Sequence, residues 1–304
     1  RDLLVAEILQ EARLAPRAAE AARIAIAGGD RPAALVNLRR NPGSYPAAVA
    51  VVARAATPPP SRGPDRAIPH VIVQGWFDAP MPADVHELIE TWAHHHPTWQ
   101  HLVFDTDSAS AWIREHLGAP AELAFRSAPP VGKSNLFRYA YLSLAGGLWS
   151  DADDRCVSSL EPLILGRSLV VLRESLGAIA DNLVAAAPGH PVLVATRDEA
   201  FRNVNDGFAE SPWLANGPGV LTRHAAAWLA GMLDDEPSDF LIASGPRMFE
   251  YVDMHQPLAY KETSLAWDVP ADPSAPLEAH LERPWAAPRP LSRRQRALLE
   301  AADE

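Results

Sequence analysis

The chain has a single cysteine, Cys156, among its 304 residues. One cysteine cannot form an intramolecular disulfide, so a disulfide-stapled scaffold is excluded, and we expect Cys156 to act as a small buried hydrophobe. The sequence also lacks any apolar run of about 18 residues, the length that indicates a membrane-spanning helix. We therefore expect neither a disulfide framework nor a membrane span.

Positive charge is in short supply as well. The chain carries 27 Lys and Arg against 38 Asp and Glu, which gives a formal net charge of -11 and a pI of about 5.5. A chain of this charge repels polyanions, so we expect no nucleic-acid partner. It begins at Arg1 with neither an initiating Met nor a signal-type segment. We expect the natural start to lie upstream, and the bacterial cytoplasm is the default compartment.

Prolines divide the chain into regions. Residues 1–57 are rich in alanine and interrupted by Pro and Gly, which predicts a small N-terminal helical region of about four short helices. We interpret this region as a helical cap, with a docking surface for a protein partner as the alternative. Residues 58–67 indicate a stiff proline-rich linker, residues 68–270 the main domain, and residues 271–304 a proline-rich tail with a C-terminal helix. The linker predicts that residues 1–57 are dispensable for the chemistry of the main domain.

The main domain alternates apolar strands with helices. Strands are expected at residues 68–76, 102–104, 148–149 and 169–172, and helices at residues 84–95, around Trp112 and from residue 131 to the double glycine Gly146-Gly147. Hydrophobic residues make up 48% of the chain, enough for one large core. The pattern predicts an α/β domain with a mostly parallel central sheet.

Three aspartates follow the short strand at residues 148–149. In an extended segment, residues two apart point to the same side, so Asp151 and Asp153 are expected to converge. Two such carboxylates suit a hard divalent ion, Mg²⁺ or Mn²⁺, which keeps positions open for water and phosphate oxygens. The pattern favours a diphosphate ligand. The same spacing recurs at Asp105 and Asp107, where capping of the next helix is the favoured interpretation.

Two segments carry a resemblance to a known family. Residues 133–139 (KSNLFRY) and 145–153 (AGGLWSDAD) resemble the Asp-x-Asp sugar-binding region of glycosyltransferase family 32, which contains the yeast initiating mannosyltransferase, bacterial capsule-type transferases and, distantly, the clostridial glucosylating toxins. Further similarities follow in the family's order at residues 68–72, 92–97, 189–191 and 217–218. The resemblance implies a GT-A-type, Rossmann-like nucleotide-binding fold. It also implies a metal-dependent hexosyltransferase that uses a UDP- or GDP-sugar with retention at the anomeric carbon.

The resemblance also implies roles for single residues. Asp151 and Asp153 would bind the metal and act in catalysis, while Arg138 would reach the donor sugar or its phosphates. Trp76 would stack on the nucleotide base, and Asn216 would lie beside the donor sugar. Each of these assignments competes with an ordinary role, because an aromatic residue at a strand end usually belongs to the core and a single helical arginine usually lies on the surface.

The chain departs from the family pattern at two places. Asn135 stands where the family has Asp, which preserves hydrogen bonding but removes a charge. The family's terminal His-rich element is reduced to Ser264 and Trp267, so His255 is the fallback third metal ligand. Residues 182–192, by contrast, resemble the family's Asn-rich loop. Within them His190 opens the next helix, and we favour a capping role for it over a catalytic one.

Two other functions stay open from the sequence. A non-catalytic sugar-nucleotide or glycan-binding protein is compatible with Asn135 and with the missing terminal histidines. A hydrolase of nucleotide sugars would share every donor contact. The acceptor is equally open, because fold similarity does not identify a glycan, lipid, protein or small molecule.

Overall fold

The computed structural model describes residues 27, 29, 31–40, 43–55, 67–174, 177–207, 212–231, 239–254 and 256–263. Several predictions fall outside these residues. The proposed linker at 58–67, except Ala67, and the tail at 271–304 are among them, as are His255, Ser264 and Trp267. The proposed domain boundaries therefore stay predictions.

A six-stranded sheet forms the centre of the described chain, in the order β2-β1-β3-β6-β5-β7. Every neighbouring pair is parallel except the two that involve β6, which runs antiparallel to both β3 and β5. The prediction of an α/β fold with a mostly parallel sheet is confirmed. The strands are β1 (Val71–Gly75), β2 (Gln100–Phe104), β3 (Gly147–Ser150), β5 (Leu169–Arg173), β6 (Ile179–Ala186) and β7 (Phe240–Ser244).

Strand β6 corrects the prediction of a loop that begins at Asn182. Residues 179–186 read IADNLVAA, and Asp181 and Asn182 interrupt the apolar pattern. The strand tolerates both because each side chain finds a partner: Arg138 pairs with Asp181, and the Asn182 amide donates to Asp154. Polar groups that are satisfied in this way can be buried in a strand.

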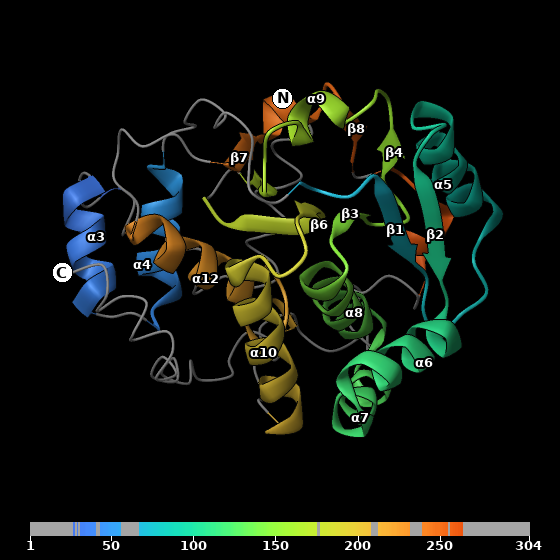
Figure 1. Ribbon diagram of the computed structural model, residues 1–304, viewed down its shortest axis with the longest axis horizontal. Helices are drawn as coiled ribbons and strands as arrows, with labels where there is room; N and C mark the ends of the chain where they lie inside the picture. The colour runs from blue at the N-terminus through green and yellow to red at the C-terminus, as the bar shows by residue number, and fades with distance from the viewer. Residues whose placement is uncertain are drawn as a thin grey trace.

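Helices cover both faces of the sheet, as Figure 1 shows. The expected helices at residues 84–95, around Trp112 and before Gly146 are present as α5, α6 and α8. The helices are α3 (Arg31–Arg40), α4 (Tyr45–Ala53), α5 (Ala83–His95), α6 (Thr106–Leu117), α7 (Ala119–Ser127), α8 (Pro130–Leu144), α9 (Glu161–Ile164), α10 (Pro191–Asn205), α11 (Pro212–Ala215), α12 (Pro218–Ala230), α13 (Gly245–Met248) and the 3₁₀ helix η1 (Ala259–Glu262). A small second sheet pairs β4 (Arg155–Cys156) with β8 (Val252–Asp253).

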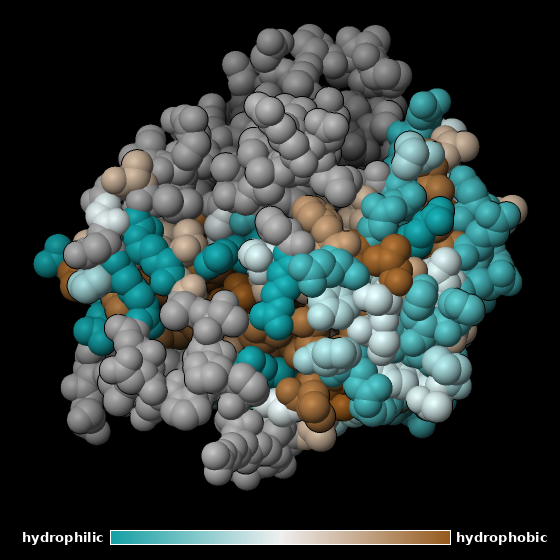
Figure 2. All heavy atoms as spheres, turned by 90° about the horizontal axis from the view of Figure 1, so that it is seen from above, coloured by the Kyte–Doolittle hydropathy of each residue, from teal (hydrophilic) through white to brown (hydrophobic). Residues whose placement is uncertain are grey.

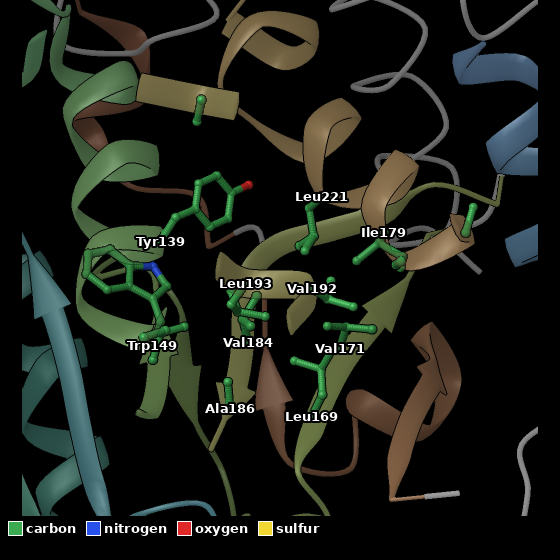
Figure 3. Close-up of a cluster of buried hydrophobic side chains, with 14 of the residues drawn as sticks. Tyr139, Trp149, Leu169, Val171, Ile179, Val184, Ala186, Val192, Leu193 and Leu221 are labelled. Atoms are coloured by element: carbon green, nitrogen blue, oxygen red, sulfur yellow. The ribbon is translucent and has the colours of Figure 1, made fainter. Parts of the chain in front are cut away.

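Along β3, β5 and β7, neighbouring residues alternate between two hydrophobic cores. On β3, Leu148 belongs to the core that contains Trp92 of α5, whereas Trp149 belongs to the core formed with α8, α10 and α12. Figure 3 shows the second core, with Tyr139 of α8 and Trp149 of β3 at one side of it. Trp149 is fully buried. The core therefore fixes residue 149, and the residues that follow it lie at the carboxyl end of β3.

Local capping explains several element boundaries. The Asp105 carboxylate accepts from Ser108 N at 2.8 Å and begins α6, whereas the other member of that pair, Asp107, is exposed. His190 Nδ1 accepts from Val192 N at 3.3 Å and begins α10, so its structural role is present as favoured. Gly146 ends α8 with a φ of 72°, where a Cβ would lie 2.8 Å from the carbonyl oxygen of Ala186.

Helix α4 is part of the main core. Residues 47–52 are all buried, and several of them share a hydrophobic cluster with the sheet and α12. The Tyr45 hydroxyl accepts from Trp213 Nε1 at 3.3 Å. Arg173 of β5 donates to the carbonyls of Val52 and Ala53, both at 3.3 Å. Helix α4 therefore contributes buried apolar surface to the same core as the sheet.

The face of the described chain that is seen from above is mixed in polarity. In the view from above, hydrophobic residues gather toward the middle and hydrophilic residues along the right side (Figure 2). Within the residues that the structure describes, no helix has the length and apolar character needed to span a membrane.

Candidate functional site

The three aspartates follow β3 in a turn. Asp154 N donates to the Asp151 carbonyl at 3.2 Å, so residues 151–154 do not form the extended segment that the sequence argument assumed. Asp151 N donates to the Asn182 carbonyl at 2.9 Å, which continues the β3–β6 pairing to the first aspartate. The turn therefore places the carboxylates at the carboxyl end of β3, where open α/β sheets bind their ligands.

Asp151 is held on one side by two donors. Its Oδ1 accepts from Arg138 Nη2 at 2.7 Å and from Trp149 Nε1 at 2.8 Å, while 31% of its side chain stays exposed. Burial is the main cause that raises the pKa of Asp151 to about 6, with Arg138 opposing it and the Asp153 carboxylate adding to it. Asp153 and Asp151 are thus close enough to interact electrostatically.

Arg138 of α8 is almost completely buried, at 1% exposed. It bridges Asp151 and Asp181, and Nη1 also donates to Asn135 Oδ1 at 3.0 Å. Burial opposes its charge, but Asp181 and Asp151 raise the pKa of Arg138 above its ordinary value. A buried guanidinium with carboxylates on two sides is a fixed positive charge. Arg138 therefore supplies a fixed positive charge beside Asp151, and its contact with a donor stays a prediction.

Asp153 faces a different segment of the chain. Its Oδ2 accepts from the Tyr260 hydroxyl at 2.7 Å and lies 2.7 Å from Lys261 Nζ. Burial opposes the shift, but Lys261 and then Tyr260 hold the pKa of Asp153 below its ordinary value. The second carboxylate of the motif is thus ionised and already paired with a cation.

Asp154 is the buried member of the trio. Asn182 Nδ2 donates to its Oδ2 at 2.8 Å, and Trp92 Nε1 donates to its backbone carbonyl at 2.9 Å. Burial, with Asp153 and Asp151 nearby, raises the pKa of Asp154 well above its ordinary value, which favours the neutral acid. We assign Asp154 to holding the turn against α5 and β6.

Asn135 and Asn216, two of the candidate site residues, contact each other. Asn135 Nδ2 donates to Asn216 Oδ1 at 3.3 Å, and both side chains are buried. A Cβ on Gly217 would lie 2.9 Å from Asn135 Nδ2, so glycine at that position permits the contact. The pair joins the start of α12 to the Arg138 network.

Trp76 directly follows β1, next to the three aspartates. It packs edge-on against Tyr260, with ring centroids 5.0 Å apart, and shares a small cluster with Ala152. Its indole Nε1 is buried without a hydrogen-bond partner among the residues that the structure describes. The geometry places Trp76 near Asp153 but leaves stacking on a base as a proposal.

The candidate ligands for a divalent ion are the carboxylates of Asp151 and Asp153. Across the described ranges, no group of three or more His, Cys, Asp or Glu side chains is gathered as a metal site, and His255 lies outside them. Mg²⁺ is commonly held by one or two carboxylates, with substrate phosphates and water as further ligands. Asp151 and Asp153 fit such a site, and Lys261 contacts Asp153 in the structure.

Several residues of this network could not be assigned from the sequence. Tyr260 and Lys261 lie more than a hundred positions after Asp153, and Asp181 lies 42 positions beyond Tyr139, whose hydroxyl donates to it at 2.6 Å. One signal was available for Asp181, because an aspartate inside an apolar strand pattern needs a partner. For the other two, only the fold brings the segments together.

Residues 82–170 match the family described as "Glycosyltransferase sugar-binding region containing DXD motif". The match runs from the start of α5 into β5 and includes Arg138, Asp151 and Asp153. This part of the chain is therefore similar to a glycosyltransferase sugar-binding region, and the resemblance drawn from the sequence is confirmed.

The similar curated proteins are yeast enzymes. The chain is 24% identical over 127 residues to the mannosyl phosphorylinositol ceramide synthase SUR1 of Saccharomyces cerevisiae, covering 42% of this chain and 33% of that protein. The chain is 27% identical over 150 residues to the initiation-specific alpha-1,6-mannosyltransferase of Schizosaccharomyces pombe, covering 41% of this chain and 38% of that protein. It is 24% identical over 192 residues to inositol phosphoceramide mannosyltransferase 1 of the same yeast, covering 60% of this chain and 59% of that protein. The chain thus spans between 33% and 59% of the length of these relatives.

Among solved structures, the chain is similar to the PaToxG glycosyltransferase. The TM-score is 0.46 and the sequence identity is 16%, with 66% of this chain and 79% of that chain covered.

Proposed function

We propose that this chain is a metal-dependent glycosyltransferase of the GT-A type that moves a hexose from a nucleotide-diphosphate sugar to an acceptor, with retention at the anomeric carbon. The observation that carries the proposal is the buried Arg138, fixed between Asp151 and Asp181 at the carboxyl end of β3. A fixed cation beside carboxylates suits a ligand that offers both phosphate and sugar hydroxyl groups. The two similar Schizosaccharomyces proteins are named mannosyltransferases, so mannose is the first sugar to test.

Different residues would contact the sugar, the base and the diphosphate of the donor. Arg138 and Trp149 orient Asp151, which leaves its outer face available to sugar hydroxyls. Asn135 and Asn216 lie against the same guanidinium network and would contact the sugar, while Trp76 would stack on the base. A divalent ion bound by Asp151 and Asp153 would neutralise the charge that develops on the diphosphate leaving group.

Product analysis with a panel of UDP- and GDP-sugars tests this function. We expect one nucleotide sugar to release its nucleoside diphosphate when Mn²⁺ is present, and EDTA to stop the release. Asp153→Ala should lower the rate by about 100-fold or more, because several kcal/mol of charge stabilisation are lost. Asp107→Ala is the matched control, since it removes an exposed aspartate from the other Asp-x-Asp pair.

The products separate the transferase from its alternatives. Sugar found on an added acceptor supports the transferase, whereas free sugar as the sole product with every acceptor class would identify a nucleotide-sugar hydrolase. Binding of a nucleotide sugar with no turnover would identify a non-catalytic binding protein. If no nucleotide sugar binds at all, the proposed function is contradicted.

A further inference from the structure

Lysine is rare in this chain: only Lys133 and Lys261 are lysines among its 27 basic residues. Both form ion pairs with aspartates, Lys133 with Asp78 at 2.5 Å and Lys261 with Asp153 at 2.7 Å. Asp153 is the second carboxylate of the motif that matches the sugar-binding family. The cation that contacts this carboxylate in the structure is therefore an ammonium group of the chain itself.

The position of Lys261 is fixed by its neighbours. It lies in η1 beside Tyr260, whose hydroxyl donates to the same Asp153 oxygen at 2.7 Å. The ammonium is 5.8 Å from the Tyr260 ring centroid, and that ring in turn packs against Trp76. The Lys261 side chain is 32% exposed, so water and small ions can reach it. Two independent contacts thus bring η1 to Asp153.

We propose that Lys261 is a built-in counter-ion that competes with a divalent ion for Asp153. An ammonium and a divalent ion that both contact one carboxylate lie close together and repel each other strongly. A divalent ion that binds Asp153 must therefore displace Lys261, which weakens metal binding to the free protein. The proposal rests on the proposed function in so far as it takes Asp153 as the metal ligand.

The competition also couples the metal to the donor. An ammonium displaced from Asp153 is free to pair with the negatively charged diphosphate of a nucleotide sugar. Metal and donor then each favour the other's binding, and this coupling is reciprocal. Lysine suits such an exchange because it is a point charge on a flexible stem rather than a rigid, bidentate group.

Direct titration with Mn²⁺ in the absence of donor tests the proposal, with free Mn²⁺ measured by electron paramagnetic resonance. We expect weak binding to the parent chain and an affinity about tenfold or more higher in Lys261→Met, within the range typical of coupled sites. Lys261→Arg keeps the positive charge and should bind as weakly as the parent. Lys133→Met removes the other lysine ion pair and should also leave the affinity unchanged. Adding Asp153→Asn to Lys261→Met should abolish the gain.

Equal Mn²⁺ affinities in the parent and in a folded Lys261→Met protein would overturn the proposal, and so would undetectable binding in both. If Lys261→Met does not fold, the parent chain with ¹³C-methylated lysines gives a second readout. Addition of Mg²⁺ should shift the Lys261 signal and leave the Lys133 signal in place, and an unmoved Lys261 signal overturns the proposal. Neither measurement involves a nucleotide sugar, so a failure here is distinct from a failure of the proposed function.

Discussion

At the scale of single residues, the site is a network in which the buried charges are paired with opposite charges. Arg138 is buried with carboxylates from the Asp151 turn and from β6, and the Tyr139 hydroxyl also donates to Asp181. Charged groups this deeply buried persist only when they are paired, and removal of one partner leaves the other uncompensated. For the stability of the site, the charge of each neighbour of Arg138 therefore matters more than the size of that neighbour.

We expect Asn135→Asp to lower the free energy of unfolding by about 1–3 kcal/mol. Arg138 already pairs with two carboxylates, so a third adds repulsion rather than a missing partner. The substitution also removes the amide that donates to Asn216. Donor binding should survive within about tenfold, because an oxygen acceptor for Arg138 remains. Urea unfolding and donor titration measure the two effects.

A double variant gives the control for this prediction. Adding Asp181→Asn to Asn135→Asp restores two carboxylates around Arg138, and it should recover part of the lost stability. Strictly additive losses in the double-mutant cycle would show that the two positions are not coupled through Arg138. Activity that is absent in the parent and appears in Asn135→Asp would favour a binding protein that lost its catalytic aspartate.

Some residues of this charge network could be grouped from the sequence alone, and others could not. Arg138, Asp151 and Asp153 could be predicted because they lie within one local motif. Lys261 could not be paired with Asp153, because the contact joins segments that only the fold brings together. The sequence instead suggested His255, which lies outside the residues that the structure describes.

At the scale of elements, β3 and α8 fix the site from the core side. Trp149 is buried in the core beside α8, and its indole N–H reaches Asp151 while the Arg138 guanidinium lies 5.1 Å from the ring centroid. The helix, the strand and the glycine turn between them could be predicted from periodicity and from the glycine pair. Strand β6 could not, because Asp181 and Asn182 conceal it until their partners are known.

We expect Trp149→Phe to weaken donor binding by about threefold to tenfold, because Asp151 loses one of its two fixed donors. The matched control is Trp92→Phe. Trp92 is equally buried, but its indole donates to the backbone carbonyl of Asp154 rather than to a carboxylate. Both variants should lose similar stability by thermal unfolding, and only Trp149→Phe should lower the affinity. Equal losses of affinity would indicate a general loosening of the turn.

At the scale of the whole molecule, one core joins the N-terminal helix α4 to the sheet. The proline-rich stretch suggested a separable cap, but residues 47–52 are buried against α12 and Arg173 binds the end of the helix. Composition predicts that these residues are helical, yet it cannot show which surface a short alanine-rich helix covers. Whether residues 1–57 are dispensable for the chemistry of the main domain stays a prediction, and the burial of α4 leads us to expect a loss of stability when they are removed.

A matched pair of substitutions tests this view of α4. Val51 is fully buried in α4, whereas Val36 in α3 is 45% exposed. We expect Val51→Ala to lower the free energy of unfolding by about 1–3 kcal/mol and Val36→Ala to lower it by less than about 0.5 kcal/mol. Urea unfolding measures both. Equally small losses would return α4 to the status of a peripheral cap.

Calorimetric titration of the full chain with GDP-mannose and a panel of other nucleotide sugars, with Mn²⁺ present, tests the donor site most directly. We expect saturable binding of one donor at one site per chain. Asp151→Asn should abolish this binding while the protein stays folded, because Arg138 and Trp149 then hold an amide in place of the carboxylate that faces the sugar. Unchanged donor affinity in a folded Asp151→Asn protein would contradict the assignment of the site.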